Sequence, residues 1–104
     1  MHLNEYQHEA MGFRLPQAND LYALYNLPGE VGELMSLEAK MIRDGVDWRQ
    51  HRDKVLKELG DILWTLTAVA VDYGYSLEDV AKANIDKLTN RKNNNTIQGN
   101  GDDR

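Results

Sequence analysis

Four carboxylates occur in two pairs of the same spacing, and this is the feature of the sequence that points most directly to chemistry. Glu30 and Glu33 form the first pair, and Glu58 and Asp61 form the second. Residues three apart on a helix project from neighbouring positions of one face. Two such helices packed side by side would therefore bring four oxygen donors together. Mg²⁺ prefers carboxylates, water and phosphate oxygens, so the pattern predicts a magnesium site.

The position of Glu30 argues against ordinary surface charge. At about 100° per residue, an apolar stripe runs along one side of its helix, formed by Leu27, Leu34, Leu37 and Met41. Glu30 points into this stripe, where an ionised carboxylate is costly unless it is paired or binds a metal. The alternative is that all four carboxylates are solvated and pair with the lysines Lys40, Lys54 and Lys57.

A row of hydrogen-bond donors lies nearer the C-terminus. Asn84, Lys87 and Arg91 recur at i, i+3 and i+7 beside an apolar face. Lysine and arginine neutralise phosphate charge and bond its oxygens, so such a row beside a metal site suits a triphosphate. Taken alone, the same row is also what an exposed basic stripe looks like.

Helices are the elements that must position these residues. β-branched residues are sparse and strict alternation is absent, whereas apolar residues recur at spacings of three and four. We therefore predict an all-α, four-helix, bundle-like fold in which residues 1–92 form the domain and residues 93–104 form a flexible tail rich in Gly, Asn and Asp. The expected helices cover about 3–12, 19–44, 48–73 and 77–92.

Capping residues and breaks set these bounds. The predicted N-caps of the last three helices are Asn19, Asp47 and Ser76, and Asn4 or a neighbour caps the first. Asp20 is expected in the first turn of the second helix, and Gly45 is expected to end it. Pro28 predicts either a kink or a fresh helix start within that stretch.

Composition narrows the class of protein. The chain has 104 residues, 41% of them hydrophobic, so it can build one modest core and should gain from association with a second copy. It has no cysteine, and its net charge of −5 argues against a partner that is a nucleic-acid polymer or an anionic membrane. The N-terminus lacks a basic region followed by an apolar one, so we expect a cytoplasmic protein.

These motifs together resemble the MazG-like branch of the all-α nucleotide pyrophosphohydrolases. The segments that carry the resemblance are residues 29–34 (GEVGEL), 57–62 (KELGDI) and 84–88 (NIDKL), followed by Arg91. Their order, intervening length and helix placement all match, and both ends of the chain are also similar. The resemblance implies that the four carboxylates bind Mg²⁺, with Mn²⁺ as a substitute, that Lys87 and Arg91 contact phosphates, and that Asn84 contacts substrate or sugar.

The implied reaction is hydrolysis of a nucleoside triphosphate, ribo or deoxy, between its α and β phosphates. The products are the monophosphate and pyrophosphate, and house-cleaning of non-standard nucleotides is one role that fits. A carboxylate would accept the proton of the attacking water, with Glu33 and Glu58 as the candidates. Many relatives carry a further acidic residue where this chain has Gly29, so this site is expected to hold fewer acidic groups.

The residues that read the base are predicted less directly. Trp48 could stack on a base and Gln7 could bond its edge, although packing explains either residue as well. Base-specific relatives acting on dCTP, dUTP or phosphoribosyl-ATP would share the same chemistry. A non-catalytic helical interaction module is the alternative from another class, and a di-iron bundle would need a second copy of the ExxH at Glu5 to His8. We expect a homodimer first and a homotetramer second.

Overall fold

A computed structural model describes residues 1–19 and 21–102 of the chain as helices joined by short connections. The helices are α1 (Leu3–Met11), α2 (Tyr22–Asp44), α3 (Trp48–Asp72) and α4 (Leu77–Asn93). Within these described ranges there is no strand, which confirms the prediction of an all-α fold with four helices. No helix in the described part of the chain is both long enough and apolar enough to cross a membrane.

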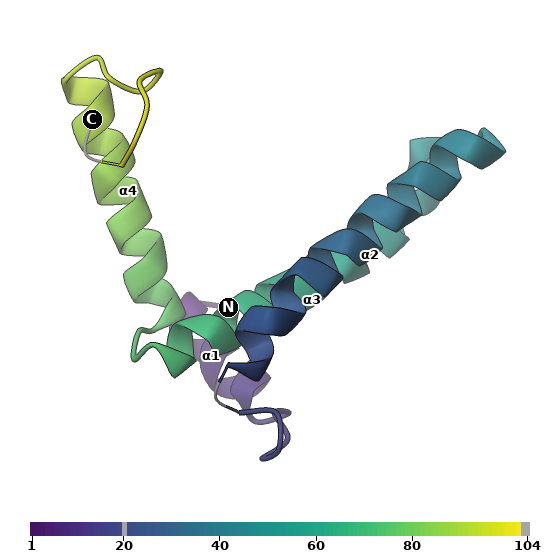
Figure 1. The fold of residues 1–104 in the computed structure, drawn as a ribbon, viewed down its shortest axis with the longest axis horizontal. Coiled ribbons are helices and arrows are strands. Elements are labelled where there is room, and N and C mark those ends of the chain that lie inside the picture. Colours follow the sequence, from purple (N-terminus) through teal and green to yellow (C-terminus); the bar gives the residue numbers. More distant parts are fainter. Residues whose placement is uncertain (20, 103–104) are drawn as a thin grey trace.

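The local signals that separate α2, α3 and α4 act as predicted. Gly45 adopts the left-handed conformation, with φ of 65°, directly after α2. The side chain of Asp47 accepts the backbone N–H of Arg49 and so caps α3. Ser76 and Asp79 form a reciprocal capping box at the start of α4. These turns are short, so α2 and α3 form an antiparallel hairpin (Figure 1).

The predicted start of the second helix is wrong. α2 begins at Tyr22 and has Leu21 as a cap without a side-chain bond, whereas Asn19 lies in the preceding loop. Asp20, predicted for the first turn, lies outside the described residues. α2 also continues through Pro28, so no fresh helix starts there. Proline removes one helical hydrogen bond, and the packing of α2 along α3 outweighs this loss.

The first helix starts at Leu3 as predicted, but Asn4 does not cap it. His2 precedes α1 and forms no side-chain cap, while the amide of Asn4 donates to Glu78 on α4 over 2.7 Å. The indole N–H of Trp64 donates to the carbonyl of Ala10 over 2.9 Å, which fixes α1 against α3. α1 therefore contacts both α3 and α4 and adds to the direct contact between those two helices.

Within a single chain the helices do not close into a bundle, and completion of the bundle-like core by a second copy stays a prediction. α4 contacts α1 and α3 but makes no contact with α2, and in Figure 1 it diverges from the hairpin to form an open V. The radius of gyration is 16.7 Å, against about 13 Å for a compact chain of this length. The buried apolar residues are accordingly few, namely Ala10, Ala23, Met41, Ala68, Ala70 and Leu77.

Candidate metal centre

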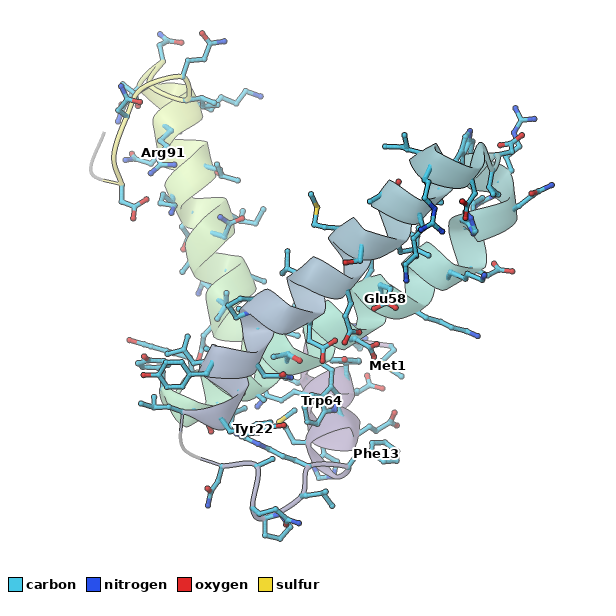
Figure 2. All side chains as sticks on the ribbon, turned by 45° about the vertical axis from the view of Figure 1, so that its right-hand side comes forward. Met1, Phe13, Tyr22, Glu58, Trp64 and Arg91 are labelled. Atoms are coloured by element: carbon cyan, nitrogen blue, oxygen red, sulfur yellow. The ribbon has the colours of Figure 1, made fainter. Side chains whose placement is uncertain are left out.

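The α2–α3 hairpin brings together the four carboxylates that the sequence singled out. Glu30 and Glu33 lie one helical turn apart on α2, and Glu58 and Asp61 lie in the same way on α3. One carboxylate oxygen from each of the four lies within 4.8 Å of the others. Figure 2 shows Glu58 at the contact between the two helices. The antiparallel packing of two short acidic motifs thus creates the cluster.

The electrostatics of this acidic cluster are those of a site that lacks neutralising partners. Glu58 is half-buried, and its Oε2 atom is buried without a hydrogen-bond partner among the described residues. Burial, followed by the negative charges of Glu33, Asp61 and Glu30, raises the pKa of Glu58 above its ordinary value. The solvated-charge alternative required these carboxylates to pair with lysines. Among the described residues, none of the four forms such an ion pair.

An oxygen-only donor set with an unpartnered buried oxygen fits a hard divalent cation. Mg²⁺ and Mn²⁺ both accept carboxylate oxygens. The pKa of Glu58 is raised first by burial and then by repulsion from its acidic neighbours, and a positive ion would offset this repulsion. Glu30 and Glu58 are half-buried, while Glu33 and Asp61 are exposed. A bound ion would therefore remain open to solvent and to a substrate on the side of the exposed pair.

Two residues that the sequence did not assign to the acidic cluster, Asn26 and Tyr6, interact with it. The amide of Asn26 donates to Glu30 over 3.2 Å and so orients that carboxylate. Its position four residues before Glu30 was a signal that could have revealed it. The pKa of Tyr6 is raised, first by burial and then by the charge of Asp61, so the docking of α1 brings this phenol close to the cluster.

The donor row lies apart from the acidic cluster in this chain. Asn84 and Lys87 line an open hollow of about 750 Å³ along α4, together with Tyr75. Arg91 lies further along α4, buried beneath the C-terminal tail (Figure 2). Since α4 makes no contact with α2, a single chain does not place these donors over the four carboxylates.

The two residues predicted to read the base lie in different surroundings. Trp48 stands at the start of α3 and lines a hollow of about 350 Å³, with the guanidinium groups of Arg49 and Arg52 each 5.8 Å from its ring centre. The side-chain oxygen of Gln7 accepts the backbone N–H of Leu77 over 2.7 Å. This bond occupies Gln7 at the first turn of α4, so we omit it from the candidate site.

One comparison with known proteins identifies a family, and two relatives are similar in sequence. The sequence model of the MazG nucleotide pyrophosphohydrolase domain matches residues 18–96, a span that contains the acidic cluster and the donor row. The chain is 35% identical to the Gene 37 protein of Mycobacterium phage L5 over 114 aligned positions, which cover all of both chains. It is also 40% identical to the uncharacterized protein YvdC of Bacillus subtilis over 42 residues, 40% of each chain. No solved structure matches it.

Proposed function

The chain belongs to the MazG nucleotide pyrophosphohydrolase family, and on this premise we propose that it hydrolyses nucleoside triphosphates to monophosphates and pyrophosphate. The observation that carries the proposal is the convergence of four carboxylate oxygens within 4.8 Å on two helices. Glu30, Glu33, Glu58 and Asp61 would hold Mg²⁺, for which Mn²⁺ could substitute. The substrates include the standard nucleotides and, for a house-cleaning role, non-standard ones.

Each residue has a distinct task in this proposal. The bound cation would supply a positive charge for the phosphate oxygens and would acidify a coordinated water. Glu33 and Glu58 are the candidates for the base, and at Glu58 burial and then its three acidic neighbours raise the pKa. Asn26 holds Glu30 in position from within α2. Lys87 and Arg91 would neutralise the outer phosphates, and Asn84 would bond the substrate beside them.

A second copy of the chain would bring the donors and the acidic cluster together. The exposed face of α3 carries a row of leucines at spacings of three and four, Leu56, Leu59, Leu63 and Leu66, which are 68%, 49%, 36% and 36% exposed. On α4, Ile85 is 60% exposed. Exposed apolar rows on two helices support an interface between copies. We therefore propose a homodimer, or a homotetramer built from it, in which α4 of one copy faces the hairpin of another.

Measurement of pyrophosphate release tests the activity. The purified protein is incubated with Mg²⁺ and a panel that includes the standard triphosphates, dUTP, dCTP and phosphoribosyl-ATP. We expect release from at least one of them, abolished in Glu58→Gln and Asp61→Asn and retained in Glu38→Gln, an exposed glutamate of α2 outside the acidic cluster. Near wild-type release by both cluster variants would refute the assignment. The preferred nucleotide would also separate a broad enzyme from a base-specific one.

Mixing two inactive variants tests the shared site. Glu58→Gln removes a cluster residue and Lys87→Ala removes a donor. If the two groups meet across an interface, a heterodimer of these variants contains one site with both lesions and one intact site. Random assortment makes half of the dimers mixed, so about a quarter of wild-type activity should return. No recovery after subunit exchange would place both groups in one chain instead.

A further inference from the structure

The chain reverses its direction directly after α4. Asn95 has a φ of 54°, in the left-handed region, and its N–H donates to the carbonyl of Lys92 over 3.2 Å. The N–H of Thr96 donates to the carbonyl of Arg91 over 2.8 Å. These two bonds form the paired closing pattern that ends many helices and turns the chain back along them. The segment 94–102, called here the C-terminal strap, is thereby directed back along α4.

The end of this strap lies on two of the three proposed substrate-binding residues. A guanidinium nitrogen of Arg91 donates to the carbonyls of Gly101 and Asp102 over 3.3 and 3.2 Å, and to the carboxylate of Asp102 over 3.3 Å. The ammonium of Lys87 pairs with the same carboxylate oxygen over 3.3 Å. Arg91 is only 5% exposed as a result, although it lies on a helix that projects from the rest of the chain.

The strap satisfies these cations incompletely. The Nε–H of Arg91 is buried and has no hydrogen-bond partner among the described residues. The two contacts to the carboxylate of Asp102 each measure 3.3 Å, longer than the roughly 2.7–2.9 Å typical of bonds between a cationic N–H and an anionic oxygen. A phosphate group presents three oxygens and more charge than one carboxylate. It could therefore engage both cations and the unpartnered Nε–H, which Asp102 does not.

We propose that the C-terminal strap is an autoinhibitory contact: the carboxylate of Asp102 occupies the phosphate-binding cations Lys87 and Arg91 until a polyphosphate displaces it. This inference rests on the proposed function. The two cations also lower the pKa of Asp102, so its carboxylate is charged throughout the neutral range. The strap is a tethered competitor, always present near the site. It is nevertheless displaceable, because the side chain of Asp102 is 86% exposed and solvent screens its ion pairs.

The experiment compares the binding of inorganic pyrophosphate to the full-length protein and two full-length variants. Asp102→Asn removes the competing charge and keeps the shape of the side chain. Glu9→Gln removes one negative charge from an exposed position of α1 and serves as the control. Exposed ion pairs change an equilibrium constant by up to about fivefold. Calorimetry should therefore show a dissociation constant about two- to fivefold lower for Asp102→Asn than for wild type, and an unchanged one for Glu9→Gln.

A spectroscopic measurement reports on the strap itself. In wild-type protein labelled with ¹⁵N, added pyrophosphate should shift the amide signals of Gly101 and Asp102 toward those of a free chain. The Arg91 Nε–H signal should move as the new ligand binds it. Unchanged or weaker pyrophosphate binding in Asp102→Asn would overturn the inference. So would pyrophosphate binding that leaves the strap signals in place, or no pyrophosphate binding by the wild type.

Failure of the proposed function would look different. In that case no triphosphate yields pyrophosphate with Mg²⁺, while pyrophosphate still displaces the strap and binds Asp102→Asn more tightly. Conversely, Mg²⁺-dependent hydrolysis with equal KM in wild type and Asp102→Asn would support the proposed activity and refute autoinhibition by the strap. If both proposals hold, Asp102→Asn lowers KM for the triphosphate by the same two- to fivefold factor and leaves kcat unchanged.

Discussion

Replacement of Glu58 by glutamine should stabilise the metal-free protein at neutral pH. Burial, then the charges of Glu33, Asp61 and Glu30, raise the pKa of Glu58 above the ordinary 4.5. A carboxylate whose pKa is raised by folding contributes stability below its unfolded pKa and loses that contribution as the pH rises through its folded pKa. Glutamine does not ionise. The metal-free variant should therefore lose less stability than wild type between mildly acidic and neutral pH.

Addition of Mg²⁺ should reverse this order. At a metal concentration about 100 times the dissociation constant, binding stabilises the folded state by about 2.7 kcal/mol. For a domain of about 100 residues this raises Tm by about 11–22 °C, at about 4–8 °C per kcal/mol. Mutation of a residue that only hydrogen-bonds a metal ligand lowers metal affinity by up to about 100-fold. Loss of a ligand carboxylate itself should therefore weaken Mg²⁺ binding by about 100-fold or more. The same Mg²⁺ concentration would then stabilise the variant by only about 0.4 kcal/mol, or about 2–3 °C.

Thermal melts followed by circular dichroism would measure both effects. Wild type, Glu58→Gln and the control Glu38→Gln are melted with a chelator and with Mg²⁺, at one protein concentration because association also shifts Tm. Glu38 is exposed on α2 and is not part of the acidic cluster, so its variant should respond to Mg²⁺ as wild type does. A Mg²⁺ shift of equal size in Glu58→Gln, or a metal-free variant less stable than wild type, would refute the reasoning.

Three further outcomes follow from the geometry. Ser76→Ala removes the capping box of α4 and should cost about 1 kcal/mol, measured by urea unfolding. Hydrogen bonds from Ser76 lower the pKa of Asp79. The stabilisation from this carboxylate is therefore complete above its ordinary pKa of 3.8 and is lost as the pH falls through the lowered value. In melts over a pH series, Asp79→Asn should lose less stability than wild type as the pH falls. Leu56→Asp should dissociate the oligomer in sedimentation, and Gln17→Asp, which places the same charge at an exposed loop position outside α3 and α4, should not.

The sequence predicted the features that depend on interactions between residues close together in the chain. Asp47 and Ser76 cap helices because their side-chain oxygens reach backbone N–H groups two or three residues away, and Gly45 tolerates the left-handed conformation. The acidic cluster needed only one tertiary assumption, that α2 and α3 pack side by side, and their short connection favours that packing. The convergence of the four carboxylates was therefore accessible from spacing and periodicity alone.

Features that depend on competition between distant interactions were not accessible in this way. Pro28 looked like a break, yet packing along α3 carries α2 through it. Gln7 was predicted to bond the edge of a base, whereas its side-chain oxygen accepts the N–H of Leu77, 70 residues away. The influence of Asp61 on the pKa of Tyr6 likewise depends on how α1 docks, a contact fixed by the bond from Trp64 to Ala10. No pattern within a single helix encodes these partners.

The sequence could not predict that the donor row lies apart from the acidic cluster, for a similar reason. Periodicity identifies an apolar face but does not say which chain covers it. On α3, one such face packs against α2, while the row beginning at Leu56 remains exposed, as does Ile85 on α4. A closed bundle within one chain would bury both surfaces and bring Lys87 toward Glu58. The open V leaves both surfaces and both halves of the site available to another copy, so in the proposed oligomer the burial of these leucines and the assembly of the site become the same event.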